Sequence, residues 1–563
     1  MAASIRTPEN ERLEELPAAK LGQRLMELPA RKRMEIILGR ADAESVVAGL
    51  ADQDFFVTLK ELGPHDALPL LAMGTLEQLN HVFDIEWWRK DTVLPASALE
   101  WLELLGRAGE GKVLSWLFHV DFELLTLLFK RWIRLVVLPE DVDLLEARES
   151  LPARSIDDQF FWECRYPQYE DLVQHLLGLI FETHQGFYLE LMNHILWLPD
   201  SECEEAAYRF HRGRLEDRGV PDFYDSLTIY RAPRPQELRR RRASEEPPFE
   251  GSVPAFALAL APEGDLLRRC LAEIRDNRLV DMLGFELASL ANKVLVADEL
   301  PPDQPRALQR AADKAGAYVN LGLMQRGGGS LSEAMSVLKD VYLEDLFRLG
   351  HATVAKLRSG LQSLVAEGWL ARWPHGIQCL DSEWLEWAEL ILQRTPQLRR
   401  KGAGKETGGL EGFFRTPQDI AEAEHGIEVL LAMGKLFDAL WEPGATPNWR
   451  LPPDGVVSRM EDVTLGAMIW TAASRFLRGG EWRLMPIPVS EWEALWARLE
   501  PDAMLGAIHG WVSRVLKDEA EMELAGVYLK PIEDLYAHQM APFLSRPGAA
   551  PDPRLVRFLI FAE

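Results

Sequence analysis

The sequence has little cysteine for its length. Its four cysteines, Cys164, Cys203, Cys270 and Cys379, are widely separated, and no two have the two-residue spacing of a zinc knuckle or a redox dithiol. A chain of 563 residues can bury several hydrophobic cores without disulfides or structural metal. We therefore expect reduced, buried thiols in a cytoplasmic protein.

Long apolar runs are also missing. The most apolar long stretch, residues 113–138, is interrupted by several ionisable side chains. That is too many for the roughly 20 residues that cross the hydrocarbon of a membrane. The first 26 residues lack the apolar core of a signal peptide, so we expect a polar leader there. The sequence thus predicts neither a membrane span nor secretion.

Positive charge is scarce as well. The chain has 62 Lys and Arg against 88 Asp and Glu, a formal net charge of -26. A strongly acidic chain repels phosphate backbones at long range. We therefore do not expect the chain to bind nucleic acid, and we expect its partner to be another protein. The oligomeric state does not follow from the sequence.

Motifs of the common enzyme classes do not occur. The sequence has no nucleophile elbow, no dinucleotide fingerprint and no P-loop. The glycines at 327–329 follow no expected strand, so we interpret them as the end of one helix, with Ser330 and Glu333 capping the next. We predict no catalytic residues and no cofactor, and we favour a protein that is not an enzyme.

What the sequence does contain is helical periodicity. Through residues 27–91, short segments open on a turn or capping residue and then carry apolar residues at three- and four-residue steps. Helices of about 10 residues are marginal alone and bury their apolar stripes on neighbours. We predict an all-α, multi-domain fold of short stacked helices, superhelical or repeat-like, with at most a small β-hairpin near residues 369–380.

Tryptophan is abundant, with 18 residues, and several occur in pairs at helical spacing. Examples are Trp369 with Trp373 and Trp492 with Trp496. Residues three or four apart share a helix face. We therefore interpret these pairs as interhelical packing rather than as an exposed binding platform.

Two stretches carry resemblances to known families. Residues 27–91, with acidic caps every 11 or 12 residues, resemble the helical superhelix domain of magnesium-transporter proteins, which implies an architecture and no binding residues. The segment RLEDRGVPDFYDSLTIY (214–230), with residues 286–298 and 320–338, resembles a bacterial family numbered as domain of unknown function 6178. That resemblance implies a bacterial, intracellular protein and supplies no activity or partner.

Proline-rich and charged stretches set the expected domain boundaries. We expect a polar leader (1–26), a superhelix-like domain (27–147), a helical hairpin with the signature turn (148–231), a linker (232–254), a helical domain with a winged-helix-like end (255–398), a second linker (399–412) and a C-terminal helical domain (413–563).

Histidines concentrate between residues 160 and 211. His175, His184 and His194 fall on an expected hairpin of two helices, and Glu190 lies four residues before His194. Imidazoles and carboxylates on facing helices can hold a divalent metal or orient a general base. The spacing matches no ligand motif, and a polar groove with a structural or protein-binding role is the alternative interpretation.

Charged residues gather at the turn that follows. The candidate binding residues are Arg209, Arg212, Arg214, Glu216, Asp217 and Asp222. They fit an ion-pair network that locks the turn, or an anion site.

Three functions stay open on this basis. The leading hypothesis is a non-catalytic cytoplasmic scaffold whose stacked helices bind another protein. The alternative is a metal-binding protein or enzyme that uses the histidines and carboxylates of residues 160–211. The third is a DNA-binding regulator through a winged-helix-like segment at 339–380, whose net charge of about +1 is weak for DNA.

Overall fold

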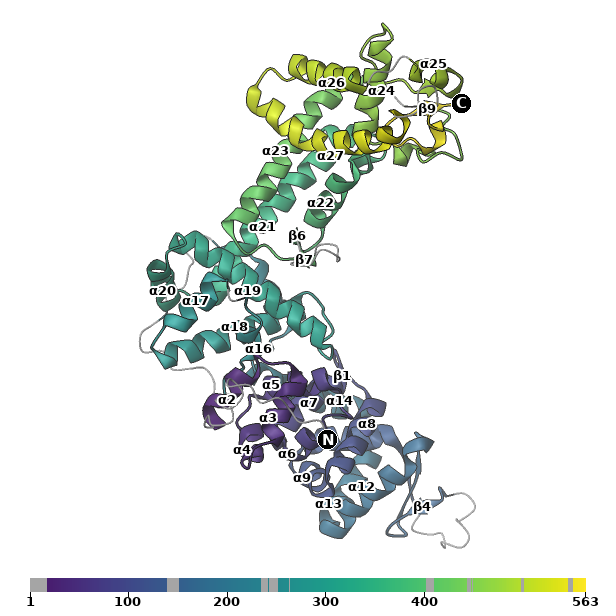
Figure 1. Ribbon diagram of the computed structural model, residues 1–563. Helices are drawn as coiled ribbons and strands as arrows, with labels where there is room; N and C mark the ends of the chain where they lie inside the picture. The colour runs from purple at the N-terminus through teal and green to yellow at the C-terminus, as the bar shows by residue number, and fades with distance from the viewer. Residues whose placement is uncertain are drawn as a thin grey trace. The chain divides into compact units, whose positions relative to one another are not determined.

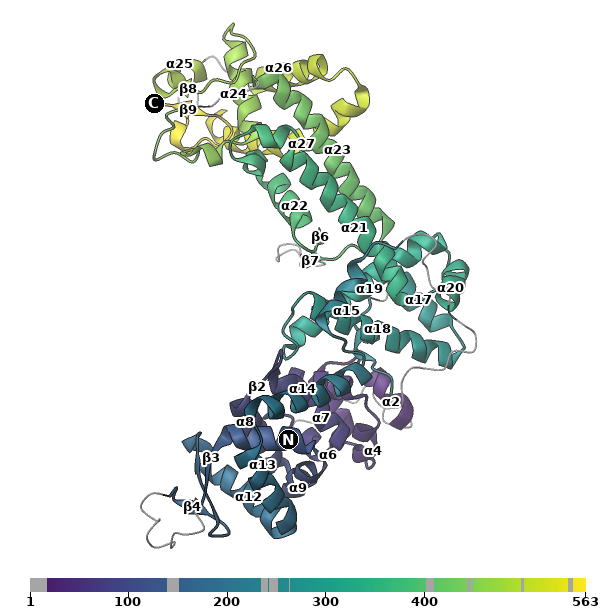
Figure 2. The same cartoon turned by 180° about the vertical axis from the view of Figure 1, so that it is seen from behind.

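The structure is a computed structural model that describes residues 18–138, 151–233, 241, 252–262, 264–400, 410–442, 447, 449–497, 501–544 and 550–563. Its contacts divide the chain into two compact units, Met1–Leu349 and Gly350–Glu563 (Figures 1 and 2). The division falls inside the helix α21 (Leu343–Ala366), where the sequence predicted no boundary.

Unit 1 begins with a stack of short helices. They are α2 (Ala18–Leu25), α3 (Ala30–Leu38), α4 (Ala43–Ala48), α5 (Asp52–Leu62), α6 (Leu68–Met73), α7 (Leu76–Glu86), α8 (Pro95–Ala108) and α9 (Glu110–His119). Helices two apart in the order touch, so α2, α4, α6 and α8 form one row and α3, α5, α7 and α9 another. The expected stacking of short helices is confirmed. The last third of the expected leader, from residue 18, contains the helix α2, which buries Leu21 and Leu25.

Burial of apolar stripes holds these helices in place. Phe55 and Leu59 of α5 and Leu79 of α7 are fully buried, and Phe83 of α7 stacks on Trp87 with ring centroids 4.1 Å apart. Each such side chain contributes roughly 1.5–3 kcal/mol when removed from water. Packing rather than intrinsic propensity therefore stabilises helices this short.

The rest of unit 1 adds longer helices and two small sheets. The elements are β1 (Trp88–Arg89), β2 (Thr92–Val93), α10 (Phe122–Trp132), β3 (Ile133–Val137), β4 (Arg154–Ser155), β5 (Phe160–Cys164), η1 (Pro167–Tyr169), α12 (Glu170–Thr183), α13 (Gln185–Trp197), α14 (Asp200–Asp217), α15 (Phe223–Leu227) and η2 (Thr228–Tyr230). β1 and β2 form a hairpin, and β3, β5 and β4 form an antiparallel sheet in that order, with Leu135 opposite Trp162. The expected hairpin of two helices is α12 with α13.

A second group of helices completes unit 1. It contains α16 (Phe256–Ala259), α17 (Leu266–Glu273), α18 (Asn277–Ala297), α19 (Pro305–Gly327), α20 (Leu331–Asp340) and the start of α21. A Cβ on Gly322 of α19 would lie 2.0 Å from the carbonyl oxygen of Leu346, so this approach requires glycine. Gly328 ends α19 at φ 59°, and the Ser330 side chain accepts the amide of Glu333, as predicted.

Much of the expected linker 232–254 lies outside the described residues. Arg241, which is described, donates to the carboxylate of Glu286 and to the carbonyl of Val341, and its guanidinium lies 4.9 Å from the centre of the Tyr342 ring. Near the end of the linker, Ser252 donates to the carbonyl of Gly49 at 2.8 Å. Arg241 is therefore held by its own chain.

Unit 2 is built on two long helices. Its elements are η3 (Trp369–Arg372), η4 (Gly376–Cys379), α22 (Ser382–Leu392), β6 (Leu398–Arg400), β7 (Leu410–Gly412), α23 (Pro417–Leu440), η5 (Met460–Asp462), α24 (Leu465–Leu477), β8 (Ile487–Pro488), η6 (Val489–Glu491), α25 (Trp492–Trp496), α26 (Pro501–Val515), α27 (Glu519–Leu544), η7 (Pro553–Leu555) and β9 (Phe561–Ala562). α23 packs on α27, and the buried α24 packs on α26. β9 pairs in parallel with β8, and the amide of Ile560 donates to Thr471 Oγ1 of α24 at 2.9 Å. The middle of the second expected linker, residues 401–409, lies outside the described residues.

The small β-hairpin that the prediction allowed near residues 369–380 does not form. The described backbone there makes two 3-10 helices, η3 and η4, because its amides bond three residues back, as Trp373 does to Leu370, instead of across a strand pair. Trp369 and Trp373 are 4% and 2% exposed, and Trp369 Nε1 donates to the carbonyl of Leu430 at 2.8 Å. Their expected packing role is confirmed. The described residues 369–380 do not form the β-hairpin that a winged-helix domain would have there.

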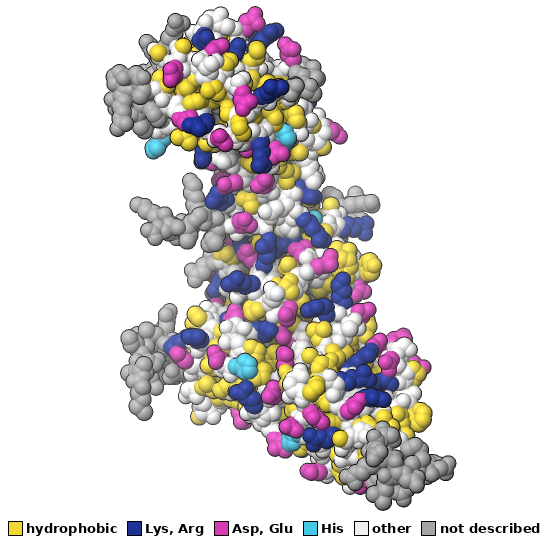
Figure 3. Space-filling model, turned by 90° about the vertical axis from the view of Figure 1, so that its right-hand side faces the viewer, with side chains coloured by type: hydrophobic (Ala, Val, Ile, Leu, Met, Phe, Trp, Pro, Cys, Tyr) yellow, Lys and Arg dark blue, Asp and Glu magenta, His cyan; other side chains and the backbone are white. Residues whose placement is uncertain are grey.

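The surface mixes charges of both signs. Figure 3 shows Lys and Arg interspersed with Asp and Glu over the face it draws. No described helix combines the length and the apolar composition that a membrane crossing needs.

Candidate functional site

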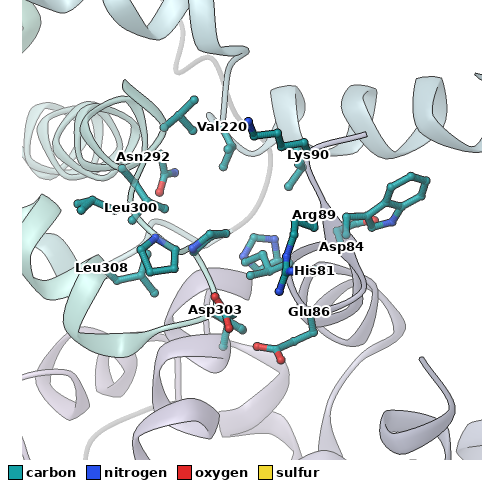
Figure 4. A pocket seen from close by; sticks show the side chains of 18 of the residues that line it. His81, Asp84, Glu86, Arg89, Lys90, Val220, Asn292, Leu300, Asp303 and Leu308 are labelled. Atoms are coloured by element: carbon teal, nitrogen blue, oxygen red, sulfur yellow. The ribbon is translucent and has the colours of Figure 1, made fainter. Parts of the chain in front are cut away.

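A cavity of about 750 Å³ lies inside unit 1, where segments distant in sequence meet. Its walls come from α5, α7, the β1–β2 hairpin, α14, the turn before α15, the end of α18 and the turn into α19. Figure 4 shows His81 and Arg89 on the side opposite Leu300 and Leu308. The lining combines apolar side chains with polar ones, as is typical of a small-molecule pocket.

Helix α7 supplies the polar wall. It begins at a capping box in which Thr75 and Gln78 each bond to the other's backbone amide. The Gln78 amide group also donates to the carbonyls of Val47 and Leu50 at 2.7 and 2.8 Å, which fixes α7 on α4. Position 81 and position 84 share one face of this rigid helix, and that face lines the cavity.

His81 is the most unusual side chain of the wall. It is 1% exposed and packs edge-on against Phe56, with ring centroids 6.1 Å apart. Neither ring nitrogen has a hydrogen-bond partner among the described residues. Burial, with a smaller contribution from the charge of Arg218, lowers the pKa of His81 to about 4. The imidazole is therefore neutral at pH 7 and offers one donor and one acceptor.

Two more lining residues carry buried polar atoms without a partner in the described parts of the chain. They are Oε1 of Gln53 on α5 and Nε1 of Trp88 on β1. The other side-chain atom of Gln53, Nε2, is 3.4 Å from the carbonyl of Arg218. Together with His81 they give the wall acceptors and donors that the fold itself leaves unused.

Asp84 is the opposite case on the same helix face. It is 3% exposed, and its carboxylate accepts from His211 Nδ1 at 3.2 Å and from Arg214 Nε and Nη2 at 2.9 and 2.6 Å. Arg214 also donates to Asp121 of α10. Burial alone would raise the pKa of Asp84, but the bonds and charges of Arg214 and His211 lower it below its usual range. This network joins α7, α10 and α14.

An aromatic stack continues this wall. The Trp88 ring lies parallel to the His211 ring, with centroids 4.4 Å apart and an interplanar angle of 11°. Tyr208 of α14 lies at an angle beside both. A flat apolar surface of this kind accommodates a ring or an alkyl chain.

Asp54 fixes the back of the cavity. Its carboxylate accepts the backbone amides of Ala255 and Phe256 at 2.8 to 3.0 Å, and Phe256 lines the cavity. Burial raises the pKa of Asp54 to about 7, although the two amides and Arg33 lower it. The segment after the linker is thereby held to α5.

Exposed charges of both signs stand at the rim. Arg89 and Lys90 come from the β1–β2 hairpin, and Glu299 and Asp303 come from the turn between α18 and α19. None of the four forms an ion pair with any residue that the structure describes. We call Arg89 and Lys90 the positive edge of the rim, and Glu299 and Asp303 its negative edge.

Glu86 is a further acidic residue of the lining, and its charge is balanced by a lysine. It pairs with Lys60 at 2.7 Å and accepts from Trp101 Nε1 at 3.3 Å. Burial raises its pKa, an effect that the nearby charge of Asp303 increases and the bond to Lys60 opposes.

Lys90 and Glu299 have left-handed backbones. Their φ values are 59° and 52°, and Asp158 is the one other non-glycine residue with positive φ in the described parts of the chain. Lys90 opens the two-residue turn of the hairpin, where Gly or Asn is favoured. Glu299 follows the end of α18, where the amide of Leu300 bonds back to the carbonyl of Leu295 in a Schellman motif that usually has glycine at this position.

The structure places the predicted metal residues apart from this cavity. His175 faces Glu110 at 3.9 Å, and the Nδ1 atom of His184 accepts the amide of Phe187, which caps α13. His194 Nδ1 lies 2.8 Å from the carbonyl of Glu190, one turn earlier. Across the described residues, His, Cys, Asp and Glu form no group of three or more that could hold a metal ion. The metal hypothesis stays a prediction without a geometric site.

The predicted charged turn is partly in the site. Arg212 and Asp222 line the cavity, where Arg212 pairs with Glu216 at 2.8 Å and Asp222 caps α15. Arg214 lies behind the wall in the Asp84 network. The remaining two residues of the prediction, Arg209 and Asp217, are exposed and are not among the lining residues.

Sequence reasoning missed the wall and most of the rim. The stretch NHVFDIEWWRKD, residues 80–91, contains His81, Asp84 and both rim cations. Its signal was the pair of polar residues, 81 and 84, set among the apolar residues of α7, which are Leu76, Leu79, Val82, Phe83 and Ile85. That signal identifies a polar helix face, and only the fold shows that a cavity lies against it.

The architecture and the cavity together define a mostly α-helical protein with a pocket that apolar and polar side chains line together. The chain belongs to a family of unknown function (DUF6178), whose model matches residues 10–562. The match confirms the family that the segment at 214–230 resembles. No curated protein and no solved structure matches the chain.

Proposed function

We propose that this protein is a ligand-binding protein that takes up a small organic molecule in the cavity of unit 1. The observation that carries the proposal is His81, a buried neutral imidazole on the cavity wall whose two nitrogens bond to no described residue. A partner for those nitrogens would come from a molecule in the cavity.

Unsatisfied polar atoms gather at the wall of this cavity. A buried donor or acceptor without a partner costs about 1–3 kcal/mol, and native proteins tolerate few of them. His81, Gln53 and Trp88 bring several such atoms to one cavity. A ligand that bonds to them recovers this free energy on binding, because the wall is already formed and rigid.

The size of the cavity supports the same function. A volume of about 750 Å³ falls within the roughly 300–1,000 Å³ of ligand pockets. The aromatic stack of Trp88 and His211 provides apolar contact area. The expected scaffold role is a further proposal, for which the exposed rings of Trp197 and Tyr224 offer contact area to a partner protein. A location in the cytoplasm stays a prediction.

A cavity-filling variant tests the proposal. Leu300→Trp places a large ring in the cavity, and Leu189→Trp makes the same change at an exposed position of α13 outside the lining. Ligand-observed NMR with a set of amino acids, short peptides and aromatic acids measures binding to each protein. We expect saturable binding to the parent and to Leu189→Trp, and binding at least about tenfold weaker to Leu300→Trp.

Circular dichroism verifies that both variants retain their helices. If the folded Leu300→Trp protein binds the same compounds as tightly as the parent, the cavity is not the binding site. Absence of saturable binding to the parent protein would also overturn the proposal.

A further inference from the structure

The rim and wall of the cavity identify the class of its ligand. Resting on the proposed function, we infer that the ligand is a short peptide with free ends, whose carboxylate is held by Arg89 and Lys90 and whose ammonium group is held by Glu299 and Asp303.

The exposed cations and anions of the rim come from two different elements, the β1–β2 hairpin and the 299–303 turn. The cavity also contains Asp84, Glu86 and Arg212, but each of these is already paired, with Arg214, Lys60 and Glu216. Two cations on the β1–β2 hairpin and two anions on the 299–303 turn stay without an ion pair among the described residues. A ligand of one sign would match one edge and be repelled by the other, whereas a zwitterion matches both.

Two of these four charged residues have an unusual backbone conformation. Lys90 and Glu299 hold left-handed conformations that glycine would adopt with less strain. Strain of this kind is concentrated at functional sites, where the surrounding structure maintains it. Two of the three left-handed non-glycine residues in the described chain thus belong to the rim of one cavity, and they carry opposite charges.

The wall of the cavity contains neutral hydrogen-bonding groups. Oε1 of Gln53 accepts, Nε1 of Trp88 donates, and the neutral ring of His81 does both, and all are buried and unpartnered in the described structure. Neutral donors and acceptors match the amide groups of a peptide backbone, which are themselves neutral. The stacked Trp88 and His211 rings then face its side chains.

Affinity-selection mass spectrometry on the full chain tests this inference with four pools of tripeptides. One pool has free ends, one is N-acetylated, one is C-amidated and one is blocked at both ends. We expect the free pool to be retained about tenfold more than either singly blocked pool, because each block removes one charge-assisted contact.

Rim variants assign each end of the peptide. Lys90→Gln should reduce the preference for a free carboxylate, since Arg89 remains, and leave the preference for a free amine intact. Glu299→Gln, with Asp303 remaining, should do the reverse. The matched controls are Lys339→Gln on α20 and Glu44→Gln on α4, both exposed and outside the lining. Neither control should alter either preference.

The outcomes separate this inference from the proposed function. Equal retention of the four pools, or a rim variant that reduces both preferences equally, overturns the peptide assignment while a binding cavity stands. If no tripeptide pool is retained but another compound of the NMR set binds, the peptide assignment is likewise overturned and a binding cavity stands. If nothing binds, both fall.

Discussion

Asp84 and His81 lie one turn apart on the same face of α7, in the wall of the same cavity, and their surroundings differ completely. Asp84 accepts three hydrogen bonds from His211 and Arg214. His81 has no bond to a described residue at either nitrogen. A buried polar group with every bond satisfied holds helices together, whereas one with unused bonds is available to a ligand. The two side chains therefore place a satisfied and an unsatisfied polar group within a single helix turn.

The largest expected change in stability comes from removing Asp84, the residue of the pair whose hydrogen bonds are satisfied. Asp84→Ala leaves the His211 ring buried beside an empty position and leaves Asp121 as the remaining anionic partner of Arg214. We expect a loss of about 3–5 kcal/mol in the free energy of unfolding, measured by urea denaturation of the whole chain. Asp66→Ala, at an exposed residue after α5, is the control and should change it by less than about 0.5 kcal/mol. A loss below about 1 kcal/mol for Asp84→Ala would contradict the structural role of the network.

The next effect concerns His81 and pH. Because its folded pKa of about 4 lies below the usual value of 6.5, the unfolded chain takes up a proton first as the pH falls. The stability linked to His81 is thus present above pH 6.5 and is lost between about 6.5 and 4. We expect the parent to lose about 2 kcal/mol more than His81→Phe between pH 7 and pH 5.

Urea unfolding of both proteins at each pH measures this difference. Asp54 changes stability in the opposite sense, because its raised pKa of about 7 means that the folded state takes up its proton first. That contribution is common to the parent and the variant and cancels. Parallel pH profiles for the two proteins would show that His81 is not buried in its neutral form.

A smaller change in stability is expected at Glu299, on the rim of the cavity. Glu299→Gly relieves the left-handed backbone after α18, and we expect the free energy of unfolding to rise by about 0.5–1 kcal/mol. Glu299→Ala removes the same carboxylate without relieving the backbone, so it should leave stability unchanged. Both should weaken binding of free-ended peptides. If the Gly variant gains no stability over the Ala variant, the backbone strain assigned to Glu299 is absent.

The smallest effect is expected outside the cavity wall. Tyr224 is 80% exposed and stands next to Phe223, which lines the cavity. Tyr224→Ala should change the free energy of unfolding and the free energy of peptide binding very little, each by less than about 0.5 kcal/mol. A large loss of peptide binding would extend the site beyond the residues described above.

The helices were largely accessible to prediction. Apolar spacing identified the stacked helices of residues 27–91, and Ser330 with Glu333 identified the start of α20. These features are local, because a cap or an amphipathic stripe is determined by residues within one or two turns. The expected wing at 369–380 failed because the burial of Trp369 and Trp373, a tertiary effect, decides the local backbone.

The site was accessible only in part. The segment 206–233 contributes Arg212 and Asp222 to the lining, but His175, His184 and His194 lie elsewhere. The lining combines positions as far apart as Gln53 and Leu308, and a meeting of that kind leaves no local pattern. The unused bonds of His81 are still less visible, because an unsatisfied atom is defined by neighbours from other elements. Glu299 gave no signal either, since the glycine that marks such a helix end is replaced.

The pairing of β9 with β8 has a consequence for biosynthesis. The final segment buries Phe558, Leu559, Ile560 and Phe561 in unit 2 and bonds to α24 through Thr471. A ribosome makes this segment after every other described element, so unit 2 cannot complete its core until translation has passed residue 561, whereas the elements of unit 1 have all emerged earlier. The direction of synthesis thus sets an order of maturation in which the ligand cavity is finished first.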